Sequence, residues 1–167
     1  VALEGFQKNY LSVAQSLEGA GGEANLEPIE YPYTESYSTN TGLNSGLDLD
    51  NNGTAGQLPG DAWGFGFYHG QYAFALMSKY EIDTENTRTF QEFKWKDMEG
   101  AEIPKITICD GSQTIPDGMQ CGDEWYTAEE WDVVRLSSKN HVDAPIIIPT
   151  EKGDEVVHLL MSHPTPP

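Results

Sequence analysis

The chain has 167 residues, of which 38% are hydrophobic and 11% aromatic, and its 27 acidic and 9 basic residues give a formal charge of −18. This composition excludes a disordered acidic tail, which would lack aromatic residues, and argues against binding to a nucleic-acid backbone or an anionic membrane, which requires lysine and arginine. The length suits one domain with its own core, and no apolar run is long enough to cross a bilayer.

The first half of the chain predicts a helix, a long loop and two strands. Apolar residues recur at helical spacing over residues 6–17, and the glycines that follow are expected to end the helix. Residues 28–61 are rich in Tyr, Pro, Gly, Asn and Asp without periodicity, which indicates a long ordered loop. The apolar run 73–78 predicts a buried strand, and the loose alternation over residues 87–95 predicts another.

The segment 48–54 carries oxygen atoms at the spacing of a calcium-binding loop. Side-chain oxygens stand at positions one, three and five, followed by a glycine for the sharp turn and a backbone carbonyl at position seven. Position twelve is Pro59 in place of the usual glutamate, so we expect an aspartate two residues later to replace it. The alternative is an Asx-rich turn without an ion. The predicted ligands of a structural calcium are Asp48, Asp50, Asn52, Thr54 and Asp61.

Three glycines, Gly64, Gly66 and Gly70, raise the question of a phosphate-binding loop. Such a loop follows a strand and opens a helix, whereas these glycines precede the strand expected at residues 73–78. Tight turns between aromatic side chains are therefore the better interpretation.

An insertion over residues 103–123 contains Cys109 and Cys121, the two cysteines of the chain. Cysteines that flank a turn-rich polar loop indicate a disulfide formed in an oxidising compartment, so the protein is expected to be secreted or periplasmic. The alternative, a zinc site, would need two further Cys or His ligands nearby.

The last third of the chain predicts one helix start and one hairpin. Thr127 followed by Glu130 is the pattern of a capping box, which marks the beginning of a helix. Residues 142–148 and 156–162 have the apolar, β-branched composition of strands, and the polar turn at residues 151–154 joins them into a β-hairpin.

Two histidines are predicted to meet at one edge of this hairpin. His141 enters the first strand and His163 leaves the second, and these ends are neighbours in an antiparallel pair. With Lys139 and Asn140 they form a candidate pocket for a phosphate oxyanion, because imidazolium and ammonium groups stabilise negative charge and a histidine can protonate a leaving group. The alternative is that two unrelated histidines stand at strand ends.

Several ordered motifs together resemble one family. The motifs are GQYAFALMSKY, RTFQ, KWKDM, RLSSK and SHPTPP, which begin at Gly70, Arg88, Lys94, Arg135 and Ser162. They resemble secreted bacterial members of the endonuclease/exonuclease/phosphatase superfamily, whose fold is that of DNase I. The resemblance implies an α+β fold, a sandwich of two mixed β-sheets flanked by helices, of which residues 1–167 would be the central part of a single domain.

The resemblance also implies hydrolysis of phosphate esters with a divalent metal, Mg or Ca. It gives His163 the role of a histidine that contacts the scissile phosphate, places His141 or Asn140 beside it, and puts Gln71 and Tyr72 near the rim of the substrate site, where the residues themselves already place Lys139. The metal-holding Glu of the family would precede Val1, and its Asp-x-Asn and Asp-His pairs would follow Pro167. We therefore expect other chain segments to complete the fold, and residues 1–167 to be inactive alone.

The expected function is that of a secreted, metal-dependent phosphoesterase. Small phosphate esters are the expected substrates rather than nucleic acid, because the acidic charge repels a polyanionic duplex. The rival hypothesis is a non-enzymatic, calcium-stabilised extracellular module that uses the same fold for binding or assembly. The residues that flank this segment in its gene would discriminate the two.

Overall fold

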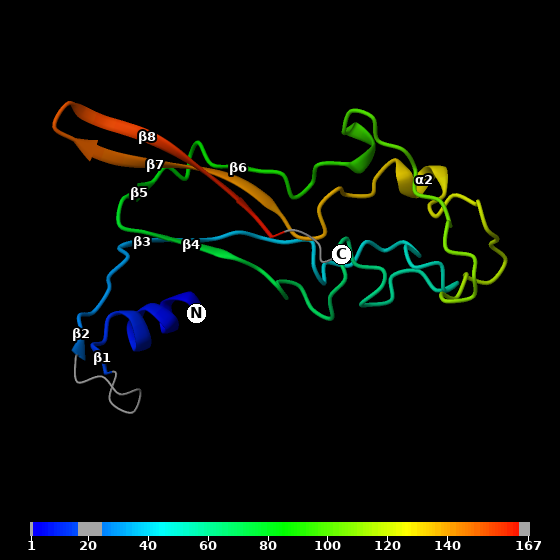
Figure 1. The fold of residues 1–167 in the computed structure, drawn as a ribbon, viewed down its shortest axis with the longest axis horizontal. Coiled ribbons are helices and arrows are strands. Elements are labelled where there is room, and N and C mark those ends of the chain that lie inside the picture. The colour runs from blue at the N-terminus through cyan, green and yellow to red at the C-terminus, as the bar shows by residue number, and fades with distance from the viewer. Residues whose placement is uncertain (1, 17–24, 164–167) are drawn as a thin grey trace. The chain divides into compact units, whose positions relative to one another are not determined.

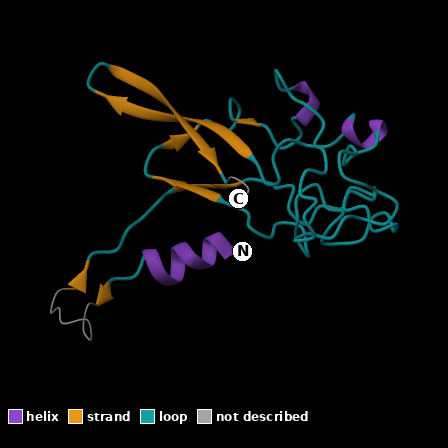
Figure 2. Ribbon diagram, turned by 45° about the vertical axis from the view of Figure 1, so that its right-hand side comes forward, coloured by secondary structure: helices purple, strands orange, loops and turns teal. Residues whose placement is uncertain are grey.

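A computed structural model describes residues 2–16 and 25–163 as an α+β chain with few helices and antiparallel strands (Figure 1). The chain divides into two compact units. Unit 1 contains Val1–Ser36, Phe74–Thr87 and Ala144–Leu159, and unit 2 contains Tyr37–Ala73, Arg88–Asp143 and Leu160–Pro167. Figure 2 shows that loops and turns make up much of the chain, so side-chain hydrogen bonds have a large part in holding it together.

Unit 1 begins with a short helix. Helix α1 (Ala2–Phe6) continues into a π-helical turn, η1 (Gln7–Leu11), where the N–H of Ser12 donates to the carbonyl of Gln7 at 2.8 Å. The helix predicted over residues 6–17 was therefore wrong in its bounds, because apolar spacing does not mark where a helix ends. Residue 17 and the glycines after it lie outside the described residues. Strands β1 (Gln15–Ser16) and β2 (Asn25–Leu26) pair antiparallel.

A second antiparallel pair in unit 1 joins β3 (Tyr33–Ser36) to β4 (Ala75–Ser78), with Glu35 opposite Leu76. Strand β4 confirms the strand predicted at residues 73–78, but Leu76 is its one buried residue. The expectation of a buried strand was wrong because a two-stranded ribbon covers little of either face. Strand β3 lies within the loop predicted at residues 28–61.

The predicted hairpin is confirmed. Strands β7 (His141–Thr150) and β8 (Gly153–Ser162) pair with each other and are joined through Glu151 and Lys152 (Figure 1). Gly153 adopts φ 115°, a backbone conformation that favours glycine in a tight turn. β7 is largely buried, whereas β8 is largely exposed.

Two short strands pair with β7 along its length. Strand β5 (Glu81–Ile82) pairs at Ile146–Ile147, and β6 (Arg88–Thr89) pairs at Val142–Asp143. The strand predicted over residues 87–95 is thus reduced to β6, and its end leads into the 3₁₀ turn η2 (Trp95–Asp97). The N–H of Phe90 still donates to the His141 carbonyl of β7, but the residues after Phe90 bond elsewhere, as Phe93 does through its carbonyl to the N–H of Leu136. The loose alternation therefore extends further than the pairing.

The capping box predicted at Thr127 and Glu130 is confirmed at the start of α2 (Ala128–Trp131). The Thr127 N–H donates to Glu130 Oε2 at 2.8 Å, and the Glu130 N–H donates to Thr127 Oγ1 at 3.3 Å. Burial, with the Glu130 carboxylate nearby, raises the pKa of the Tyr126 phenol just before this helix. Reciprocal side-chain bonds thus hold a helix of one turn that propensity alone would not stabilise.

The centre of unit 2 is polar, and the side chain of Asn40 lies at its middle, fully buried. The amide nitrogen of Asn40 donates to the carbonyls of Gln91 and Ser137, both at 2.7 Å, and its oxygen accepts from Arg135 Nη1 at 2.6 Å. Its backbone N–H donates to the carbonyl of Lys139 at 3.0 Å. One side chain therefore fixes three segments that are far apart in the sequence.

Arg135 completes this arrangement from the other side. Its guanidinium carbon lies 4.8 Å from the centre of the Trp63 ring, and Nη2 lies 3.5 Å from a Glu92 carboxylate oxygen. Burial lowers the pKa of Arg135, and Glu92 opposes that shift. Because an arginine titrates far above neutral pH, the guanidinium stays charged and keeps its bond to Asn40.

Gly64 lies against the segment 137–140. A Cβ atom at residue 64 would come 1.8 Å from the carbonyl oxygen of Ser138, and the Gly64 N–H donates to the Asn40 carbonyl at 3.0 Å. Only glycine allows two backbones to approach so closely. The glycine at residue 64 is therefore explained by the close approach of two backbone segments, whereas the sequence predicted packing of aromatic side chains around tight turns.

We predict that Asn40→Ala destabilises the protein by about 3 kcal/mol or more, because it leaves two carbonyls and a guanidinium buried without their partner. Chemical denaturation monitored by tryptophan fluorescence measures this free energy of unfolding. The matched control is Asn86→Ala, since Asn86 is exposed and bonds only to Asp83 among the described residues. A loss for Asn40→Ala no larger than that of the control would contradict the central role of Asn40.

Candidate functional site

The segment 137–140 positions two of the predicted site residues, Lys139 and Asn140, and buries both. Asn140 donates to the Ser38 carbonyl at 2.8 Å and accepts from Thr89 Oγ1 at 2.9 Å. Its side chain is thus engaged in bonds between segments. The ammonium nitrogen of Lys139 lies 5.9 Å from the centre of the Tyr72 ring, a cation–π distance.

His163 comes directly after β8 and meets Tyr72. Its Nδ1 lies 2.8 Å from the Tyr72 carbonyl oxygen. A carbonyl only accepts hydrogen bonds, so Nδ1 carries the hydrogen. Nε2 is therefore the nitrogen that can take up a proton, and it has no hydrogen-bond partner among residues 2–16 and 25–163.

Tyr72 has a backbone conformation rare for a bulky residue, with φ 60°. Gln71 holds the turn before it, because its side-chain oxygen accepts the N–H of Phe67 at 2.8 Å and its carbonyl accepts the hydroxyl of Thr41. Strained residues of this kind concentrate at functional sites. The structure thus gathers Tyr72, Lys139 and His163, with Gln71 fixing the turn that carries Tyr72.

His141 lies at the exposed start of β7 and lines a cavity with Ser162, the residue before His163. The structure therefore brings the ends of the two strands together, as predicted, although it places the two histidines in different surroundings. No hydrogen bond of the His141 ring occurs within the described part of the chain.

Sequence reasoning missed an ion pair beside His141. Arg88 Nη2 lies 2.5 Å from the buried Asp143 Oδ2, and Arg88 Nε lies 3.2 Å from the same oxygen. A signal was present, since Asp143 is the one charged residue in the otherwise apolar run from Val142 to Ile148. A buried carboxylate nearly always has a charged partner.

A second group of predicted site residues lies in and beside the loop predicted to bind calcium. One carboxylate oxygen each from Asp48, Asp50 and Asp61 lies within 4.8 Å of the others. Asp61 is fully buried and accepts the N–H groups of Asp50 at 3.3 Å and Gln57 at 2.7 Å. Asp61 thus joins the cluster from outside the loop, as the loss of the twelfth ligand predicted.

The remaining predicted ligands shape the turn. Asn52 Oδ1 accepts the N–H of Thr54 at 2.9 Å, while Asp48 accepts the N–H groups of Asn52 and Gly53 at 3.0 and 2.8 Å. Three carboxylates held this close repel one another, and a divalent cation offsets that repulsion while taking oxygen ligands. The cluster could therefore hold a metal ion.

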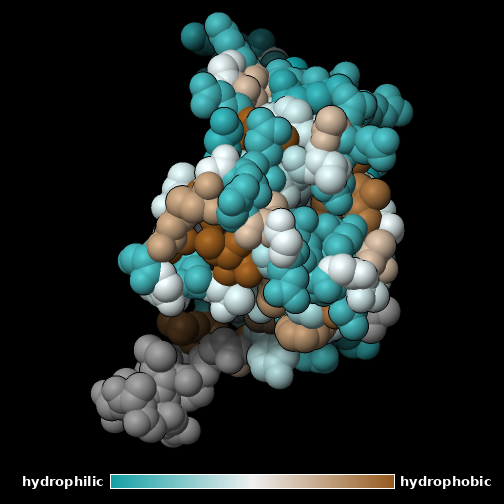
Figure 3. Space-filling model, turned by 90° about the vertical axis from the view of Figure 1, so that its right-hand side faces the viewer, coloured by the Kyte–Doolittle hydropathy of each residue, from teal (hydrophilic) through white to brown (hydrophobic). Residues whose placement is uncertain are grey.

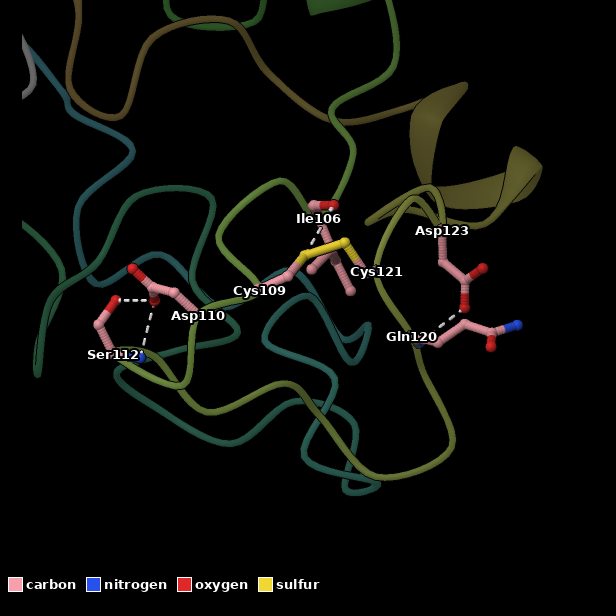
Figure 4. The surroundings of a disulfide bond; sticks show 7 residues. All are labelled: Ile106, Cys109, Asp110, Ser112, Gln120, Cys121 and Asp123. Carbon is pink, nitrogen blue, oxygen red and sulfur yellow. Dashed lines mark hydrogen bonds between the residues drawn. A yellow bond between two sulfur atoms is a disulfide. The ribbon is translucent and has the colours of Figure 1, made fainter.

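The predicted disulfide is confirmed, with Cα atoms of Cys109 and Cys121 5.9 Å apart (Figure 4). Local hydrogen bonds stabilise turns in the loop that the disulfide closes. In one of them, Asp110 Oδ1 accepts both the N–H and the hydroxyl of Ser112. The Ser112 hydrogen bonds lower the pKa of the Asp110 carboxyl. A disulfide fits an extracellular or periplasmic location.

The disulfide-closed loop and the acidic cluster share one cavity of about 600 Å³, lined by Asp48 and Asp50 on one side and by residues 114–117 on the other. Trp125 connects them, because its Nε1 donates to the Leu49 carbonyl at 2.9 Å and its own carbonyl accepts from Asn51 Nδ2 at 3.0 Å. Two features that are separate in the sequence therefore form one region of unit 2.

On the face drawn in Figure 3, hydrophobic residues lie in small groups between hydrophilic ones. None of the described helices is both long enough and apolar enough to cross a membrane.

Comparison of the chain with family models, with curated proteins and with solved structures gives no match. The site must therefore be interpreted from its own geometry.

We predict that calcium raises the melting temperature by on the order of 5 °C when its concentration is about 100 times the dissociation constant, because it binds only the folded acidic cluster. Thermal unfolding in EDTA and after addition of calcium measures the shift. Asp50→Asn should remove most of it, whereas Asp154→Asn, an exposed residue of the hairpin, should leave it intact. Identical melting of the unmodified protein in both buffers would show that the loop binds no calcium.

Proposed function

We propose that this chain supplies the phosphate-binding side of a secreted, metal-dependent phosphoesterase with the DNase I-like fold. The observation that carries the proposal is the contact of His163 Nδ1 with the Tyr72 carbonyl beside the Lys139 ammonium. In a chain of formal charge −18, the Lys139 ammonium and a histidine on the same tyrosine suit a small anion. The motif resemblance supports the same role for His163.

Each residue has a task in the proposed mechanism. The Tyr72 carbonyl fixes the tautomer of His163, so that Nε2 receives or delivers the proton. A protonated Nε2 would donate to a phosphate oxygen or to the leaving group, and Lys139 would add positive charge as negative charge develops. Gln71 would act as a positioning residue for Tyr72.

The divalent metal belongs to residues that the resemblance places outside 1–167, and when bound it would neutralise phosphate charge. The acidic cluster of Asp48, Asp50 and Asp61 is better assigned to a structural calcium, because its carboxylates already bind backbone N–H groups of their own loop. Small phosphate esters remain the proposed substrates, since the overall charge repels nucleic acid.

A non-enzymatic, calcium-stabilised extracellular module is the second candidate. The acidic cluster facing the disulfide-closed loop favours it, because a bound cation would order a surface built from loops. Under this alternative calcium would raise the melting temperature, while substitution of His163 would change no activity.

We predict that His163→Asn lowers kcat/KM for a phosphate monoester by about 100-fold or more in the protein as its gene encodes it, assayed with magnesium. Asparagine keeps a donor for the Tyr72 carbonyl but lacks Nε2, so the variant removes proton transfer while preserving the tether. His158→Asn is the matched control, since His158 is an exposed histidine on β8. Turnover by His163→Asn equal to that of the control would remove His163 from the mechanism, and turnover in EDTA would exclude the metal.

A further inference from the structure

A cavity of about 370 Å³ lies in unit 2 where the start of β7 meets the end of β8. This volume falls within the range of roughly 300 to 1,000 Å³ found for small-molecule sites. Apolar side chains dominate its walls, among them Phe90, Leu160 and Met161. The cavity could therefore enclose a compact apolar group.

Polar groups with free hydrogen-bonding capacity accompany these walls. Arg88 uses Nε and Nη2 on Asp143, which leaves Nη1 without a partner in the described ranges, and the Arg88 side chain is 69% exposed. The His141 ring and the Ser162 hydroxyl also lack protein partners within these ranges. Because Asp143 is already bound by Arg88, the free donors suit an anion.

The chain itself links the cavity to the proposed phosphate site. Ser162 lines the cavity and directly precedes His163, whose ring meets Tyr72. A substrate with its phosphate at His163 would have to extend past Ser162 to place its organic group in the apolar recess, where Arg88 and His141 are further donors.

We propose that this cavity binds the organic group of the substrate, and that the substrate is a phosphate ester of a compact apolar alcohol, such as an aryl ester. The inference rests on the proposed function and names the substrate class of the same site. A polyol phosphate fits less well, because those of its hydroxyl groups that face Phe90, Leu160 and Met161 would lose water without gaining partners there.

Two neighbouring leucines of β8 provide the test. Leu160 lines the cavity and is 77% exposed, so Leu160→Ser should remove an apolar wall without unfolding the protein. Leu159→Ser is the matched control, because Leu159 is an exposed leucine of the same strand that does not line the cavity. Hydrolysis of phenyl phosphate is compared with hydrolysis of glycerol phosphate.

The unmodified protein should favour phenyl phosphate by about tenfold in kcat/KM, the effect of burying a few apolar carbon atoms. Leu160→Ser should abolish most of this preference, and Leu159→Ser should keep it. Equal use of both esters, or equal effects of the two substitutions, would overturn the proposal.

Calorimetric binding of phenyl phosphate and of inorganic phosphate separates this inference from the proposed function. Binding of phenyl phosphate that Leu160→Ser weakens, without hydrolysis of either ester, would overturn the phosphoesterase and support the cavity. Hydrolysis with no preference for phenyl phosphate would support the phosphoesterase and overturn the cavity. Neither hydrolysis nor binding would overturn both.

Discussion

The buried amide of Asn40 is the constraint on which unit 2 depends. Its side-chain nitrogen donates hydrogen bonds to the carbonyls of Gln91 and Ser137, and its side-chain oxygen accepts one from Arg135. Hydrogen bonds have directions, whereas apolar contacts do not. A polar centre of this kind therefore fixes the positions of its segments relative to one another. It also fixes the position of Lys139, whose carbonyl accepts the backbone N–H of Asn40.

The acidic loop and the disulfide-closed loop illustrate how a loop-rich unit reaches an ordered state. The Cys109–Cys121 bond reduces the number of conformations open to the unfolded chain. Trp125 then connects this loop to the segment that carries Asp50, through bonds to Leu49 and Asn51. Covalent closure, a tryptophan and a cluster of carboxylates thus replace the sheet contacts that order most domains of this size.

Local signals in the sequence predicted the capping box at Thr127, the β7–β8 hairpin, the Cys109–Cys121 bond and the recruitment of Asp61 to the acidic cluster. Each of these features depends either on residues close in sequence or, as for the disulfide, on a residue type that has few possible partners. The helix predicted over residues 6–17 and the strand predicted over 87–95 exist in part but were wrong in their bounds, because backbone bonds at Gln7 and Phe93 end these elements where side-chain periodicity does not. Among the non-local features, the motif resemblance had already pointed to Tyr72. The lone charge of Asp143 in an apolar run signalled an ion pair, but its partner Arg88 and the bond between Asn40 and Arg135 could not be predicted, since no spacing relates residues brought together by the fold.

The close approach at Gly64 changes how mutational tolerance in this region should be interpreted. Since a Cβ at residue 64 would come 1.8 Å from the Ser138 carbonyl, every side chain is excluded there, whatever its chemistry. In a saturation mutagenesis screen for activity, substitutions at residue 64 would be tolerated as poorly as substitutions of a catalytic residue. Their effect would nevertheless reflect only the short distance between two backbone segments. Intolerance at His163 would carry different information, because a side chain of similar reach can be accommodated there and a loss of activity would report the proton transfer that we propose.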